Sequence, residues 1–229
     1  MSTVLVTGAA RGIGLATARA FVAAGWRVLA LDLDFSGPDE KNVSSVKFDL
    51  QDLSAIPGLI SSLGEIHALV NSAGVQNALP YDHYTDEARG RILRINLEAP
   101  AELIRAVAPQ MIARRSGSIV NLASIASYQP HPDLWYGVTK AGIASMTRSF
   151  AMYLGRHGIQ VNAVAPGPVE TELLKVVDAA RREKLLQQVY TGRTGRSEEI
   201  AAAILWLCTA SPTIVNGSIL DINDGTWPR

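Results

Sequence analysis

The stretch TGAARGIG, residues 7–14, follows a short apolar run and precedes a long segment with helical periodicity. In such a setting Gly8 permits a tight turn, Gly12 lets the backbone approach a pyrophosphate, and Gly14 lets the helix pack closely on the strand. The free backbone N–H groups of the helix N-terminus then face the anion. Three glycines alone are weak evidence, but their position between a strand and a helix predicts a dinucleotide-binding loop.

Short β-branched or leucine-rich runs alternate with longer amphipathic segments along almost the whole chain. Several of these runs are continuously apolar, which indicates parallel strands buried on both faces. The predicted strands are residues 3–7, 27–31, 45–49, 68–71, 118–122, 160–165 and 218–222. The predicted helices include residues 12–24, 87–97, 100–115, 136–156 and 197–208. Without a linker or a repeat, the pattern predicts one α/β domain over residues 1–229, a doubly wound Rossmann fold with a seven-stranded parallel sheet and helices on both faces.

The composition restricts the partners. Lysine plus arginine number 21 and aspartate plus glutamate number 21, so no basic surplus exists to neutralise nucleic acid. The single cysteine, Cys208, lies in an apolar run and predicts a buried core thiol in a reducing compartment. No apolar stretch approaches the roughly 20 residues of a membrane span, and strand-like residues begin at Thr3, which leaves no room for a signal peptide. We expect a cytoplasmic protein with no nucleic-acid, membrane or metal partner.

The second predicted strand leads into Asp32, 18 positions after Gly14. A carboxylate there can accept hydrogen bonds from both hydroxyls of an adenosine ribose, and its charge would repel the 2′-phosphate of NADP. Arg11 favours the opposite choice, because a cation in the loop could reach that phosphate. The repulsion between a carboxylate and a nearby 2′-phosphate should outweigh the attraction of one solvated arginine, so the sequence favours NAD over NADP.

A phenol and an ammonium group lie four positions apart at Tyr136 and Lys140, on one face of a predicted helix. A free tyrosine titrates near ~10, and a neighbouring cation lowers that pKa. Tyr136 could therefore exchange a proton with an alcohol or a developing alkoxide. Ser124 follows a buried strand, and its hydroxyl could hydrogen-bond the reacting oxygen. Each feature alone is weak evidence.

Together these features resemble the short-chain dehydrogenase/reductase family, in the shorter of its branches. The resemblance covers essentially the whole chain, and the motifs in this order are specific to the family. They are the glycine stretch at 7–14, Asp49-Leu50, Asn71-Ser72-Ala73-Gly74, Asn96, Ser124, the Tyr136/Lys140 pair and NAVAPGPVET at 162–171.

The resemblance implies a role for each catalytic position. Tyr136 would be the general acid/base and Ser124 would orient the substrate oxygen. Lys140 would bind the nicotinamide ribose and lower the tyrosine pKa, while Asn96 would hold a water that links Lys140 to solvent. The implied cofactor-binding residues are Gly8, Arg11, Gly12, Ile13, Gly14, Asp32, Asp49, Leu50, Asn71, Ala73, Gly74, Tyr136, Lys140, Pro166, Gly167, Val169 and Thr171.

The chain departs from the family pattern without losing a catalytic group. Ser72 stands where a second asparagine is usual, and Ser124 and Tyr136 are 12 positions apart, one fewer than in many relatives. The specificity segment, about 170–193, is short; its apolar residues predict either packing or a mobile lid. The substrate-contact candidates suggest a small hydroxylated substrate and are Gln76, Tyr128, His131 and Trp135.

We therefore predict an NAD-dependent oxidoreductase for a small alcohol or carbonyl compound of the polyol, sugar, hydroxy acid or cyclic diol class. An NADPH-dependent 3-ketoacyl ketoreductase stays open, favoured by Arg11 and opposed by Asp32. A dinucleotide-sensing regulator without activity is disfavoured, because such proteins typically lose the tyrosine or the lysine. An epimerase or dehydratase of the longer branch is opposed by the lack of a substrate domain. Relatives assemble through the helices predicted at 87–115 and 136–156 and the last strand, which predicts a homotetramer, or else a dimer.

Overall fold

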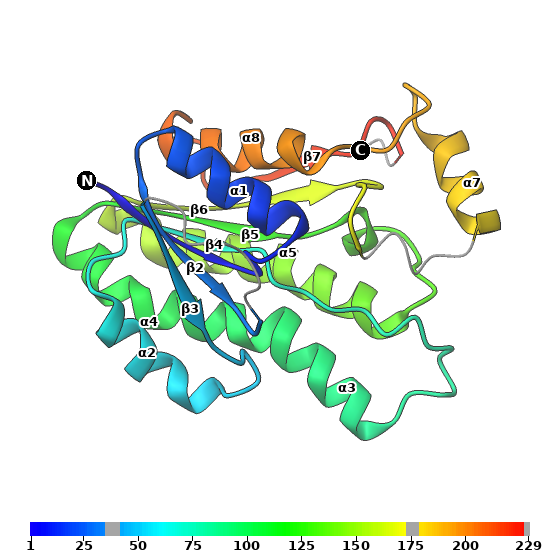
Figure 1. Ribbon diagram of the computed structural model, residues 1–229, viewed down its shortest axis with the longest axis horizontal. Coiled ribbons are helices and arrows are strands. Elements are labelled where there is room, and N and C mark those ends of the chain that lie inside the picture. The colour runs from blue at the N-terminus through cyan, green and yellow to red at the C-terminus, as the bar shows by residue number, and fades with distance from the viewer. Residues whose placement is uncertain (35–41, 173–178, 227–229) are drawn as a thin grey trace.

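A parallel sheet of seven strands forms the centre of the molecule in the computed structural model, which describes residues 1–34, 42–172 and 179–226 (Figure 1). Its strand order is β3-β2-β1-β4-β5-β6-β7. The order reverses between β1 and β4, and ligands of such sheets bind beyond the carboxyl ends of the strands at this switch point. The strands are β1 (Thr3–Thr7), β2 (Arg27–Asp32), β3 (Val43–Lys47), β4 (Ala68–Asn71), β5 (Gly117–Leu122), β6 (Ile159–Pro166) and β7 (Ile219–Ile222).

Helices cover both faces of the sheet, with α1 and α8 on one side and α2, α4 and α5 on the other (Figure 1). Alternate side chains of the buried β1 strand enter the two resulting cores: Leu5 packs with the α4 side and Val4 and Val6 with the α1 side. Both cores are therefore needed to position the end of β1. The helices are α1 (Gly12–Ala23), α2 (Ile56–Leu63), α3 (Asp86–Leu93), α4 (Ala99–Arg114), α5 (Leu134–Leu154), α7 (Ala179–Gln188) and α8 (Ser197–Thr209).

The third strand lies two residues earlier than predicted, at Val43–Lys47 instead of 45–49. The backbone N–H of Gln51 donates to the Asp49 carboxylate at 2.9 Å, and that of Asp52 donates to the Asp49 carbonyl at 3.0 Å. These bonds form a turn that takes Asp49 out of the sheet.

The helices also differ in detail from the prediction. Helix α3 passes at Leu93 into a π-helical turn, Arg94–Glu98, within the segment predicted as one helix at 87–97. Helix α5 begins at Leu134, before the predicted 136, because the Asp133 side chain caps its first turn. Helix α2 ends at Leu63, directly before Gly64, which has a φ of +78°.

Cys208 is partly buried against the core on the α8 side, and burial raises the pKa of its thiol to about 12. The thiol is therefore protonated and unreactive at neutral pH, as predicted for a core cysteine. Within the described ranges, no helix is long and apolar enough to cross a membrane.

Candidate active site

The glycine loop after β1 has the backbone that a dinucleotide requires. Gly8 and Gly12 have φ values of +68° and +55°, a left-handed region that favours glycine. A Cβ on Gly8 would lie 2.8 Å from the Cα of Ala73, and one on Gly14 would lie 2.0 Å from the Gly8 carbonyl oxygen. No side chain fits either place, so the loop and the N-terminus of α1 keep an open backbone cradle that suits a pyrophosphate.

The Asp32 carboxylate at the end of β2 lies directly beside this loop. Its two oxygens accept hydrogen bonds from the backbone N–H groups of Ala10 at 2.9 Å and Leu33 at 2.8 Å. Arg11, in contrast, is exposed, and its side chain makes no cap for α1. The geometry fits an adenosine ribose held by Asp32. Each carboxylate oxygen has a further lone pair that could accept a hydrogen bond from a ribose hydroxyl.

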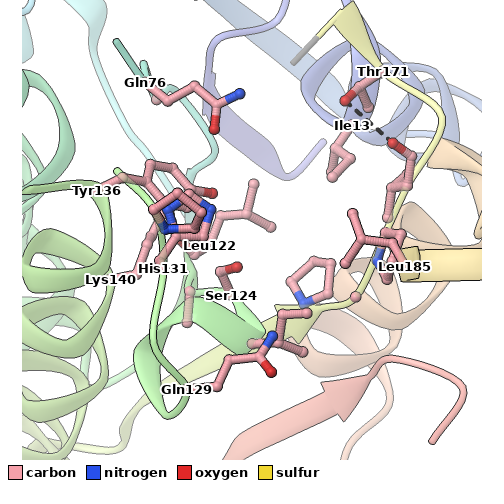
Figure 2. Close-up of a pocket in the computed structure, with 18 of the residues that line it drawn as sticks. Ile13, Gln76, Leu122, Ser124, Gln129, His131, Tyr136, Lys140, Thr171 and Leu185 are labelled. Atoms are coloured by element: carbon pink, nitrogen blue, oxygen red, sulfur yellow. Dashed lines mark hydrogen bonds between the residues drawn. The ribbon is translucent and has the colours of Figure 1, made fainter. Parts of the chain in front are cut away.

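Beyond the carboxyl ends of β4, β5 and β6 lies a cavity of about 350 Å³ (Figure 2). Tyr136, Lys140 and His131 lie on one side of it and Thr171 and Leu185 on the other (Figure 2). The predicted residues that the structure brings together in its lining are Ile13, Gly74, Gln76, Ser124, His131, Tyr136, Lys140, Pro166, Gly167, Val169 and Thr171.

Of the predicted catalytic residues, Ser124 comes from the end of β5 and Tyr136 and Lys140 come from α5. Ser124 follows β5, and its Oγ accepts a hydrogen bond from the backbone N–H of Ala126 at 3.1 Å. Tyr136 and Lys140 lie one turn apart on α5, and Lys140 Nζ is 5.6 Å from the centroid of the Tyr136 ring. Lys140 Nζ also donates to the Leu122 carbonyl at 2.6 Å, which fixes the ammonium group beneath the tyrosine.

The electrostatics require one correction. The sequence predicts that Lys140 lowers the pKa of Tyr136, but burial raises the pKa of the phenol above 10.0; a hydrogen bond with Ser124 lowers it and the charge of Asp133 raises it further. Burial also lowers the pKa of Lys140 to about 8. The ammonium charge is therefore unfavourable in this buried place, and desolvation is the largest cause of the raised Tyr136 pKa.

Asn96 lies in the π-helical turn and is 1% exposed. Its Oδ1 accepts from the Val75 N–H and its Nδ2 donates to the Val75 carbonyl, both at 2.8 Å. A Cβ on Gly74 would lie 3.7 Å from Asn96 Oδ1 and 3.8 Å from Lys140 Nζ. Asn96 thus anchors the segment after β4 close to Lys140. The residues around Asn96 in the sequence did not by themselves indicate this position.

Several predicted contacts lie outside the cavity lining. Asn71 donates to the Asn121 side chain at 2.8 Å, inside the sheet, and Leu50 belongs to the core. Tyr128 packs against a small cluster beside β6. The guanidinium Cζ of Arg89 lies 5.8 Å from the centroid of the Trp135 ring. The other predicted residues outside this lining are Gly8, Arg11, Gly12, Gly14, Asp32, Asp49, Ala73 and Asn96.

Three further side chains line the cavity: Gln129, and Lys184 and Gln188 from α7. Lys184 and Gln188 fall within the segment at about 170–193 that was predicted to carry specificity. Gln129 was not predicted, because a glutamine in a loop gives no signal of its own. Positions 173–178 of the predicted specificity segment lie outside the described residues.

Comparison with known proteins agrees with this geometry. The family model described as enoyl-(acyl carrier protein) reductase matches residues 8–226. Galactitol 2-dehydrogenase of Agrobacterium fabrum is 34% identical, over 97% of this chain and 96% of its own. The 3-oxoacyl-[acyl-carrier-protein] reductase of Thermotoga maritima is 32% identical, over 96% of each chain. A structure of a putative 2-deoxy-D-gluconate 3-dehydrogenase from Agrobacterium tumefaciens with bound NADP is 32% identical, with a TM-score of 0.92 over 100% of this chain and 97% of that one.

Fold and site together define an oxidoreductase that acts on CH–OH groups with a nicotinamide dinucleotide. The chain belongs to the short-chain dehydrogenase/reductase family.

Proposed function

We propose that this protein is an NAD-dependent oxidoreductase of small polyhydroxylated alcohols and of the corresponding carbonyl compounds. The observation that carries the proposal is the convergence of Ser124, Tyr136 and Lys140 on one cavity that also reaches Ile13 at the glycine loop. The bound nicotinamide supplies the hydride acceptor or donor. A cavity with a phenol, a hydroxyl and a buried cation at this junction suits proton exchange at the oxygen of the substrate.

In alcohol oxidation each of these side chains has a separate role. Ser124 hydrogen-bonds the substrate hydroxyl and holds it against Tyr136. In oxidation the phenolate of Tyr136 would accept the hydroxyl proton, and in reduction the phenol would return that proton to the carbonyl oxygen. Lys140 would hold the nicotinamide ribose, and its hydrogen bond to the Leu122 carbonyl fixes the position of the amine.

The cavity places several polar side chains within a lining that is largely apolar. Amide side chains of Gln76, Gln129 and Gln188 line it together with His131, and Lys184 adds a cation from α7. Such donors and acceptors suit a chain of hydroxyl groups, and Lys184 suits a terminal carboxylate. The names of the galactitol and 2-deoxygluconate enzymes among its relatives support sugar alcohols and sugar acids as the substrate class.

A second candidate is an NADPH-dependent 3-ketoacyl reductase. The similarity to the Thermotoga maritima reductase and the exposed Arg11 favour it. A panel of polyols, aldonates, hydroxy acids, cyclic diols and a 3-ketoacyl thioester, assayed with NAD(H) and NADP(H), separates the two. Turnover of a polyol or aldonate with NAD supports the proposal, and turnover of the thioester alone contradicts it.

The wild-type protein is expected to bind NAD more tightly than NADP, and Asp32→Asn should reverse this preference. The variant removes the charge that repels a 2′-phosphate, while its amide oxygen still accepts from Ala10. Loss of charge-assisted ribose hydrogen bonds costs about 1.5–3 kcal/mol each, so NAD affinity should fall at least ~10-fold. Titration calorimetry of both cofactors checks this, with Asp34→Asn as an exposed control. Tighter binding of NADP by the wild type would contradict the assignment.

A homotetramer is the expected assembly. Exposed apolar side chains lie on α5, at Met152 and Tyr153, and on α8 and β7, at Trp206 and Leu220. Exposed apolar side chains on these elements suit contacts between subunits. Light scattering should therefore show tetramers for the wild type and dimers for Leu220→Asp, whereas a wild-type monomer at micromolar concentration would contradict the prediction.

A further inference from the structure

A buried carboxylate three residues before the catalytic tyrosine connects two segments of the site. Asp133 is 1% exposed, and its Oδ2 accepts from the backbone N–H groups of Asn77 at 2.8 Å and Ala78 at 3.0 Å. Its Oδ1 accepts from the Tyr136 N–H at 3.1 Å and from the Tyr84 hydroxyl. Four donors therefore converge on one side chain.

The cluster is built around an ionised carboxylate. Burial alone would raise the pKa of Asp133, but hydrogen bonds from Tyr84 and from three backbone amides lower it below its usual value. Burial and the nearby Asp133 carboxylate raise the pKa of Tyr84, so its phenol stays protonated and remains a donor. A buried charge of this kind is retained only where its hydrogen bonds are complete.

The segment that Asp133 holds also presents a side chain to the cavity. Gln76 lines the cavity between two anchors: Asn96 grips Val75 on one side, and Asp133 binds the amides of Asn77 and Ala78 on the other. Ala78 has a φ of +52°, a strained conformation for a residue with a Cβ, and its N–H is one of those that Asp133 accepts. The carboxylate thus stabilises a backbone that would otherwise relax.

We infer that Asp133 is a positioning residue that holds Gln76 and Tyr136 in one fixed arrangement toward the substrate. Figure 2 shows these two side chains on the same side of the cavity. The inference rests on the proposed function, because it assumes that Tyr136 exchanges the substrate proton. Asp133 itself contacts Asn77, Ala78, Tyr84 and the backbone of Tyr136, and it does not line the cavity.

The charge of Asp133 also determines the direction in which its removal should shift the pKa of Tyr136. Tyr136 is faced by Lys140 from its own helix, by the His131 ring at 4.9 Å, and by Asp133, while Lys184 lines the far part of the cavity. Of these groups Asp133 carries the negative charge, and it raises the pKa of Tyr136. Removal of that charge must lower the pKa of the phenol.

The test compares Asp133→Asn with Thr85→Ala in the full-length protein. The asparagine keeps one acceptor for the cap of α5 but places an amide against Asn77 and Ala78. Thr85 caps α3 through the Ala88 N–H at 3.1 Å and is exposed, so its variant loses a helix cap away from the cavity. Kinetics, NAD affinity, hydrogen exchange and ultraviolet titration of the phenol are measured for both variants, with Tyr136→Phe as the blank of the titration.

For Asp133→Asn we expect a loss of kcat/KM of at least ten-fold, mainly through KM, with NAD affinity within two-fold of the wild type. The amides of Asn77 and Ala78 should exchange faster, and the pH profile of oxidation and the titration of Tyr136 should move to lower pH. Thr85→Ala should change none of these. An unchanged kcat/KM, or a loss of activity with an unchanged titration and unchanged exchange, would overturn the inference.

Two further arms keep the outcome interpretable. If Asp133→Asn does not fold, Tyr84→Phe is used instead, because it removes one hydrogen-bond donor and leaves the charge of Asp133. Faster exchange at Asn77 and Ala78, with a Tyr136 pKa that is not lowered, supports the inference. Unchanged exchange overturns it. The titration and exchange arms need no substrate. If the wild type turns over no alcohol, the proposed function fails, while these two arms still decide the role of Asp133.

Discussion

Tyr136→Phe is expected to lower turnover by about 10²–10⁴-fold while the fold and the affinity for NAD stay near those of the wild type. The ring keeps its packing beside His131 and above Lys140, and only the ionisable oxygen is lost. Ser124 then holds a substrate hydroxyl that has no proton acceptor. The loss should therefore fall on kcat rather than on cofactor binding.

The measurement is alcohol oxidation by the variant across a pH series, with NAD affinity measured in parallel. Tyr153→Phe is the matched control, because Tyr153 lies on the same helix and is exposed to solvent. Near-wild-type rates for Tyr136→Phe would show that another group is the base, and the assignment of the site would have to be abandoned.

Lys140→Met should abolish most of the activity and at the same time stabilise the protein without cofactor. The methionine lacks the ammonium group that we propose holds the nicotinamide ribose, so NAD affinity should fall. Removal of a cation destabilises the phenolate, so any remaining oxidation should move to higher pH. The stabilisation follows from burial: Lys140 is 4% exposed, and its pKa falls from 10.5 to about 8.

The sign of the stability effect follows from proton linkage. Between about pH 8 and pH 10.5 the unfolded chain binds more protons at Lys140 than the folded chain does, so this residue makes stability rise with pH in that window. At neutral pH the variant avoids a desolvated charge, which should raise the free energy of unfolding by on the order of 1–3 kcal/mol. Denaturant unfolding at several pH values checks both effects. A less stable variant would mean that the bond to the Leu122 carbonyl outweighs the cost of the buried charge.

A stability gain with a loss of function would also explain why a buried lysine is kept at this place. The cavity needs a fixed cation beneath Tyr136 and next to the segment that Asn96 anchors. The protein keeps that cation at a cost to its own stability, as is common where catalysis demands an unfavourable group.

The architecture and the chemical groups of the site could be predicted from the amino-acid sequence alone. Continuous apolar runs predict strands buried on both faces, and a glycine loop between a strand and a helix predicts a dinucleotide cradle; the sheet, the positive φ angles of Gly8 and Gly12 and the position of Asp32 agree with both. Tyr136 and Lys140 could be paired from helical spacing alone. These features are local or periodic, so a single segment contains the information that specifies them.

Contacts between segments that are distant along the chain could not be predicted in this way. The bond from Asn77 to Asp133 joins positions 56 apart, and that from Tyr84 joins positions 49 apart. Burial raises the pKa of Tyr136, against the prediction, and packing turns Trp135 toward Arg89 instead of the cavity. The environment of a side chain is set by whichever elements fold against it, and no spacing along the chain records that. The class of reaction can therefore be predicted from the sequence, whereas the position of the acid/base group Tyr136 depends on the fold.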